Sequence, residues 1–137
     1  MDIREMKPGR ELDALVAEKV FRWRKVHGPV TDYDGPCESF DVLVPPTIED
    51  PFPLYPPRGA IRPWWFCHKW STEISDAWEV VEKMKTCGLL VDICQVWDGY
   101  SVIFDDGSDF EKQYEHKAET APHAICIAAF LAMEDKA

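Results

Sequence analysis

The sequence predicts an α+β fold in which three helices pack around a small, mostly antiparallel sheet. Two segments carry apolar residues at helical spacing, a third is apolar nearly all round, and two runs rich in β-branched residues lie between them. Because each apolar helix face must be covered, helices and sheet are expected to form layers of a single domain. A chain of 137 residues with 46% hydrophobic residues is sufficient for one core.

Two segments are predicted as amphipathic helices. The first lies within residues 8–23 and the second within residues 70–88. In the second, Ser71 or Thr72 is expected to accept hydrogen bonds from the first-turn amides, and Gly88 is expected to supply a left-handed stop. The expected buried faces carry Leu12, Leu15, Val16, Val20 and Trp23 in the first helix, and Ile74, Ala77, Trp78, Val81 and Met84 or Lys85 in the second.

The last third of the chain predicts a hairpin and a buried helix. Residues 89–97 and 100–104 are strand-like runs joined by Asp98-Gly99, a signal for a two-residue type I′ turn. The polar stretch 105–119 holds a further short strand or a loop. Thr120 is expected to cap the last helix, with Pro122 in its first turn. Because this helix is apolar nearly all round, it is expected to lie against the sheet or a neighbouring subunit, and we expect a homo-oligomer.

A proline-rich insertion at about residues 28–63 separates the first two helices. Nine of the eleven prolines lie there, which restricts strands to short stretches such as residues 39–44 and the region near 60–66. Its aromatic residues favour an ordered insertion, with a flexible linker as the alternative.

Three sequence blocks resemble a known family. LDALVAEKVF-W (residues 12–23), WSTEISDAWEVVEKM (70–84) and TAPHAICIAAFLAM (120–133), with the hairpin before the last, are similar to the phage ABA-sandwich domain proteins. The resemblance covers about half the chain. It implies a three-layer α/β/α sandwich and a phage setting, hence the cytoplasm of an infected bacterial host, but it brings no catalytic residues. Residues 28–66 are longer and richer in proline than the usual linker.

Charge and cysteine content restrict the partners. A net charge of −10 argues against an electrostatic binder of nucleic acid or of anionic membranes. We find no leader-like segment and no run of about 18 apolar residues, so a membrane partner is not expected either. The five cysteines never form C-x-x-C and are interpreted as free thiols of a reducing cytosol.

The stretch RPWWFCHKWST, residues 62–72, is the strongest candidate site. Residues 51–72 contain no acid, although the chain carries 25. Aromatic faces stack bases, basic side chains neutralise phosphates, and helix-opening amides can receive a phosphate. The predicted ligand-binding residues are Arg58, Arg62, Trp64, Trp65, His68, Lys69, Trp70, Ser71 and Thr72. The alternative is structural: the tryptophans pack onto the sheet and the basic residues are solvated.

Metal and catalytic sites are the weaker candidates. Cys67-His68 and the pair His123 and Cys126 supply ligand types without a zinc-like spacing. Cys67 with His68 or His116 would be a thiol nucleophile set, but neighbours on a strand point to opposite faces. We therefore predict no catalytic residue, metal or cofactor.

The sequence favours a non-enzymatic phage protein that sequesters a phosphorylated nucleotide-like signal of host defence. Acidic residues gathered in 32–50 and 105–119 support a different role, as an acidic inhibitor that binds a host defence protein. A small hydrolase is the second alternative.

Overall fold

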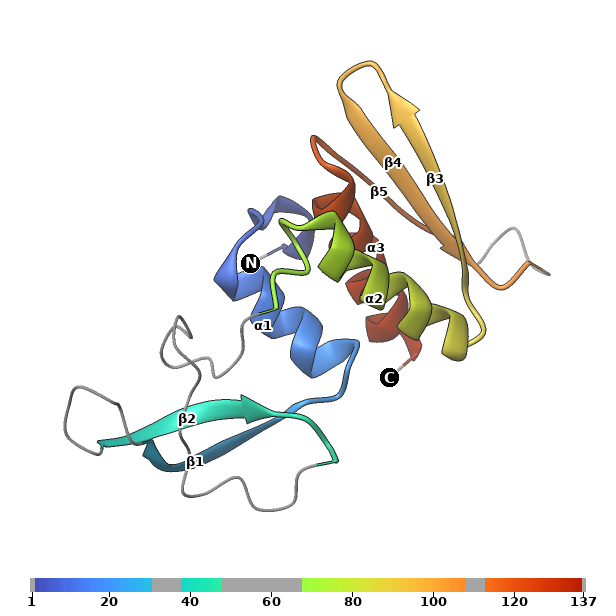
Figure 1. The fold of residues 1–137 in the computed structure, drawn as a ribbon. Helices are drawn as coiled ribbons and strands as arrows, with labels where there is room; N and C mark the ends of the chain where they lie inside the picture. Colours follow the sequence, from blue (N-terminus) through green and yellow to red (C-terminus); the bar gives the residue numbers. More distant parts are fainter. Residues whose placement is uncertain (1, 31–37, 48–67, 108–112, 137) are drawn as a thin grey trace.

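The computed structural model describes residues 2–30, 38–47, 68–107 and 113–136. After a short 3-10 turn at Ile3–Glu5, the elements in chain order are α1 (Arg10–Lys19), β1 (Arg24–Val30), β2 (Glu38–Val44), α2 (Ile74–Thr86), β3 (Leu90–Val96), β4 (Gly99–Asp105), β5 (Tyr114–Ala118) and α3 (Ala121–Lys136) (Figure 1). The α+β class with three helices is confirmed. The predicted strand near 60–66 lies outside the described residues.

Helix α3 is the centre of the core. It contacts α1, α2, β4 and β5, and residues Ala124 to Ala129 have no exposed surface. A helix that is apolar all round must be covered on every side, and here the covering elements come from one chain. Its predicted burial against the sheet is therefore confirmed. Its cap is also confirmed, because the Thr120 Oγ1 atom accepts from the His123 amide at 3.4 Å.

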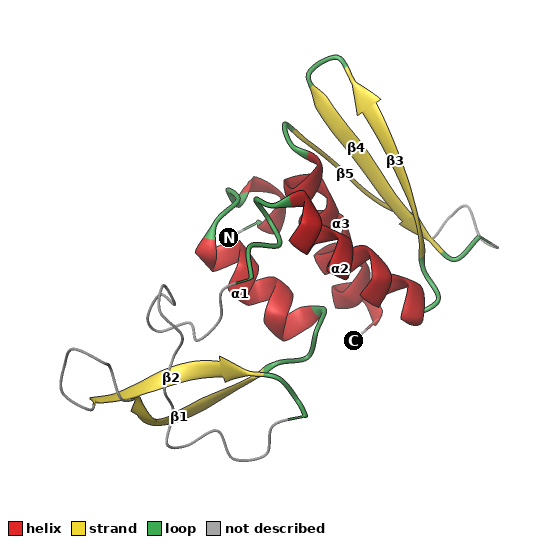
Figure 2. Ribbon diagram, viewed as in Figure 1, coloured by secondary structure: helices red, strands yellow, loops and turns green. Residues whose placement is uncertain are grey.

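The strands form two antiparallel sheets. One has the order β3-β4-β5, and the other is the pair β1-β2. Figure 2 shows the helices gathered on one side of the three-stranded sheet, with the β1-β2 pair apart from that sheet. Val102 and Phe104 of β4 are fully buried on the face that packs against α3. Among the residues that the structure describes, no helix lies on the opposite face, so the order of the three layers stays a prediction.

The hairpin of β3 and β4 is confirmed, but its predicted turn is wrong. Val96 pairs with Gly99, so the turn residues are Trp97 and Asp98. A type I′ turn needs positive φ at both turn positions, and neither residue has it. Gly99 instead opens β4 with φ 153°, where an added Cβ would lie 2.2 Å from the Ala118 carbonyl oxygen. Close approach of β5 thus explains the glycine.

The first helix is shorter than predicted. It ends at Lys19, and Arg22 adopts a left-handed φ of 60° before the chain enters β1. Strand β1 was not predicted, because the helix was expected to reach Trp23 and the proline-rich insertion to begin at about residue 28. This left residues 24–27 without an assignment. Its partner β2 corresponds to the strand predicted at residues 39–44, which is confirmed.

The second helix begins later than predicted, and its predicted buried face is confirmed at Ala77, Val81 and Met84 but wrong at Ile74 and Trp78. Glu73 occupies the N-cap position without a side-chain hydrogen bond, so the predicted cap by Ser71 or Thr72 is wrong. Ile74 and Trp78 are 53% and 48% exposed, whereas the helix buries Ala77, Val80, Val81 and Met84. The neighbours α3 and β3 select this face, and the apolar spacing alone did not distinguish it from its flank. The predicted stop is confirmed, with φ 85° at Gly88.

We expect Gly99→Ala to lower the free energy of unfolding by about 2–3 kcal/mol, because the new methyl group has no room beside Ala118. Urea unfolding followed by circular dichroism measures this. Gly107→Ala is the matched control, since Gly107 has φ 78° and open space around it, and should cost about 1 kcal/mol. Equal losses in the two variants would contradict the close approach of β5.

Candidate functional site

The predicted ligand platform is described only in its second half. Residues 68–72, here called the junction segment, run between α1 and the beginning of α2. The junction segment comprises His68, Lys69, Trp70, Ser71 and Thr72, while the predicted residues Arg58, Arg62, Trp64 and Trp65 lie outside the described residues.

Trp70 is a core residue. Its side chain is 1% exposed, and its indole ring stacks with Phe21 at 4.9 Å and with His68 at 4.8 Å between ring centroids. Trp23 meets the same ring edge-on at 5.8 Å. The aromatic partners of Trp70 therefore come from its own chain, as the structural alternative expects, and in this arrangement its ring is not open to a base.

Hydrogen bonds of Ser71 connect the junction segment to the beginning of α1. Its amide donates to the Asp13 Oδ1 atom at 2.8 Å, and its hydroxyl donates to the Gly9 carbonyl at 3.2 Å. The Gly9 amide donates back to the hydroxyl oxygen at 2.9 Å. Both Asp13 and Ser71 are buried. Burial raises the pKa of Asp13, and the hydrogen bonds from Ser71 oppose that shift in part.

The amides expected to receive a phosphate already have acceptors. The Ser71 amide donates to Asp13, and the amides of Thr72 and Glu73 both donate to the Lys69 carbonyl, at 3.2 and 2.8 Å. A phosphate at this helix start would have to replace these hydrogen bonds.

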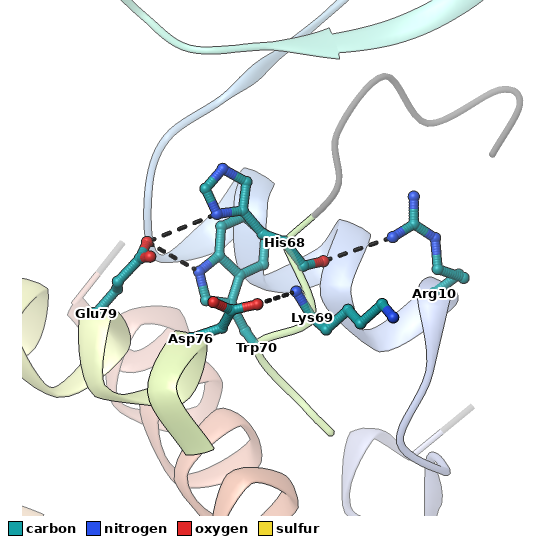
Figure 3. Close-up of polar contacts among 6 residues, drawn as sticks. All are labelled: Arg10, His68, Lys69, Trp70, Asp76 and Glu79. Atoms are coloured by element: carbon teal, nitrogen blue, oxygen red, sulfur yellow. Dashed lines mark hydrogen bonds and ion pairs between the residues drawn. The ribbon is translucent and has the colours of Figure 1, made fainter. Parts of the chain in front are cut away.

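Two carboxylates of α2 lie over the junction segment (Figure 3). The Asp76 Oδ2 atom accepts from the Lys69 amide at 2.8 Å. The Glu79 Oε2 atom accepts from the Trp70 indole nitrogen at 3.4 Å and lies 3.7 Å from His68 Nδ1. Residues 51–72 thus contain no acid in the sequence, but the folded chain brings the carboxylates of Asp76 and Glu79 against the junction segment. Its surroundings favour a cationic group over a phosphate.

The metal and thiol candidates make structural contacts instead. His123 Nε2 lies 2.7 Å from the Met6 carbonyl oxygen, and Cys126 is fully buried, which raises the pKa of its thiol. Among the described residues no group of three or more His, Cys, Asp or Glu side chains is placed to hold a metal ion. Cys67 lies outside the described residues.

A groove of about 500 Å³ lies elsewhere, between the 3-10 turn, α1 and the end of α3. Its walls are mainly apolar, with Ile3, Leu15 and Phe130 among them. Arg4, the one basic residue in its lining, lies 3.7 Å from the Asp2 carboxylate. The groove contains no residue of the predicted platform.

The family follows from comparison with known proteins. A family model, the phage ABA sandwich domain, matches residues 14–130. The chain belongs to the phage ABA sandwich domain family. The match covers more of the chain than the sequence blocks that suggested it, because it also includes the proline-rich insertion between them. No curated protein and no solved structure gave a match. Within the described part of this ABA sandwich chain, no helix is long and apolar enough to span a membrane.

Sequence reasoning missed the residues that complete the junction in this phage ABA sandwich protein. Phe21 and Trp23 follow α1 directly, yet both contact Trp70 about fifty residues later in the chain. Asp13 was not among the residues expected on the buried face of the first helix, yet it is buried. An acid among the apolar residues of an amphipathic helix was the available signal for Asp13. Nothing in the sequence pointed to Glu79.

Asp13 should make stability depend on pH. Its folded-state pKa lies above the ordinary value of 3.8, so the folded chain holds a proton that the unfolded chain releases first. Stability is therefore lost as pH rises from 3.8 through the folded-state pKa. We expect Asp13→Asn, which keeps an oxygen for the Ser71 amide, to match the wild type at low pH and to be more stable at neutral pH.

Asp13→Ala is the contrasting variant, because it leaves the buried Ser71 amide without its acceptor. Relative to Asp13→Asn, it should cost about 1–3 kcal/mol at all pH values. Urea unfolding between pH 3.5 and 7.5 compares the three proteins. A difference between wild type and Asp13→Asn that does not change with pH would contradict the raised pKa.

Proposed function

We propose that this phage protein acts by binding, without chemistry, and that its partner is a host protein with a basic surface. The observation that carries the proposal is the position of Asp76 and Glu79 at the junction segment. Glu82, exposed three residues after Glu79 on α2, extends this acidic surface, here called the α2 acidic face. A net charge of −10 would steer a basic partner toward it.

Aromatic side chains beside the carboxylates would make this face select a basic partner by shape as well as by charge. Glu79 lies beside His68, whose side chain is 40% exposed, and Trp23 contacts the His68 ring edge-on at 5.9 Å. A lysine or arginine of the partner would meet carboxylates flanked by aromatic surface, which suits a basic side chain with an apolar stem. The hydrogen bond from the Lys69 amide to Asp76 holds the backbone beneath this face.

The test uses a fluorescent peptide rich in lysine and arginine and follows its anisotropy at increasing salt. The variant Glu79→Gln with Glu82→Gln should bind it about two- to thirtyfold more weakly, since exposed pairs contribute about 0.2–1 kcal/mol each. The control, Glu115→Gln with Glu119→Gln, removes the same charge from β5 and the residue after it. Equal loss in both proteins would mean that only net charge matters and would contradict a local site.

Sequestration of a phosphorylated nucleotide-like molecule is the second candidate. It is supported by exposed Lys69 and partly exposed His68, which continue directly from the segment that carries Arg62. In this case Trp64 or Trp65 would stack the base, because Trp70 is buried. The ligand would also have to tolerate Glu79.

A thermal-shift panel of linear and cyclic nucleotides and ADP-ribose tests this second candidate. A shift of several degrees, lost in Lys69→Gln with Arg62→Gln and followed by recovery of intact ligand, would support sequestration. A shift with altered ligand would indicate the hydrolase alternative. The absence of any shift would leave the basic protein as the partner to pursue.

A further inference from the structure

The two edges of the three-stranded sheet differ in their protection. Within the described part of the chain, β3 and β5 each pair with β4 only. Strand β5 is short and carries Glu115, His116 and Lys117, and charged side chains of this kind discourage further pairing. Strand β3 is seven residues long and contains no Lys, Arg or Pro. Asp92 is its single charged residue. Among the described residues, the β3 edge is therefore free to pair with another strand.

Apolar residues are exposed on β3 and on the helix that contacts it. Leu90, at the start of β3, is 58% exposed. Helix α2 contacts β3 and carries the exposed Ile74 and Trp78 on one flank. At about 100° per residue, this flank lies roughly 100–160° around the helix from Asp76 and Glu79, which face the junction segment. The exposed flank of α2 is thus turned away from the junction segment, on the helix that contacts the edge strand.

We propose that the occupant of this edge is a second copy of the chain, paired antiparallel through β3 about a two-fold axis at Ile93. This axis pairs all seven residues of the strand. On the outer face of the sheet Leu90 then lies opposite Val96 of the second copy, and Asp92 lies opposite Cys94, each contact occurring twice. The joined sheet has six strands, with α2 and α3 of both copies on one side.

The sequence of β3 favours this register over its neighbours. Moving the axis to Asp92 would place two aspartates opposite each other, and like charges in that position repel. Moving it to Cys94 would place Asp92 opposite Val96 and shorten the ladder. With the axis at Ile93, no two aspartates lie opposite each other and all seven residues pair. The strand can therefore pair with a copy of itself, as a two-fold interface requires.

The exposed flank of α2 is needed as well. A ladder of two seven-residue strands alone is small beside the roughly 1,200–2,000 Å² of a stable interface. Trp78 and Ile74 are exposed on α2, the helix that contacts β3, and would supply apolar area from the helical layer. Tryptophan is prominent among residues that dominate interface energy.

Sedimentation velocity at increasing protein concentration tests the dimer and its register together. The wild type should be a dimer. Cys94→Glu places a carboxylate opposite Asp92 of the second copy at two sites, so it should weaken the dimer about two- to thirtyfold, whereas Cys94→Lys should preserve or strengthen it. Adding Asp92→Lys to Cys94→Glu should restore association.

Within one chain, Cys94 lies opposite Ser101, whose neighbours across the sheet are Lys117 and Glu115, so charges of both signs already flank position 94. Sedimentation reports association and not the stability of one chain, so the contrast between Cys94→Glu and Cys94→Lys tests the dimer. Gln113→Glu, beside β5, is the matched control and should leave association unchanged. Trp78→Ser should also weaken the dimer. A wild type that stays monomeric at all concentrations, or equal behaviour of Cys94→Glu and Cys94→Lys, would overturn the proposal.

Discussion

The coverage of α3 is the constraint on which the other elements depend. Its residues are apolar on all sides, so no arrangement with a water-facing surface along Ala124 to Ala129 is stable. The sheet covers one side through β4 and β5, and α2 and α1 cover the others. The positions of α1 and α2 are set by this requirement, and the junction segment then has to connect to both.

The junction segment illustrates how such a constraint decides between function and structure. Trp70 supplies a large apolar side chain where α1 and α2 meet, and Ser71 supplies the polar atoms that the start of α1 needs. Both residues therefore serve the fold. What remains for recognition is the outer rim, where Lys69 and His68 meet carboxylates of α2. Recognition of a basic protein is consistent with that rim.

Local periodicity was enough to predict the three helices, the hairpin and the Thr120 cap, because these depend on residues close in sequence. Local periodicity was not enough where contacts with distant parts of the chain decide which side chains are buried and where a helix ends. Ile74 and Trp78 fit the apolar spacing of α2 but lie on its exposed flank, and Trp23 lies outside α1 although it continues the helical pattern. The acid-free window was misleading for the same reason: Glu79 lies outside it in sequence and reaches Trp70 in space.

Amide hydrogen exchange in α3, measured at several protein concentrations, tests the central claim most directly. If one chain covers α3, the amides of Ala124 to Ala129 should exchange through global unfolding alone and be among the slowest in the protein. If a second copy pairs with β3, the β3 amides should exchange more slowly at higher protein concentration. The exchange of the α3 amides should not depend on concentration, because one chain already covers α3. Exchange in α3 that is faster than in α2, or that requires high concentration for protection, would contradict the account.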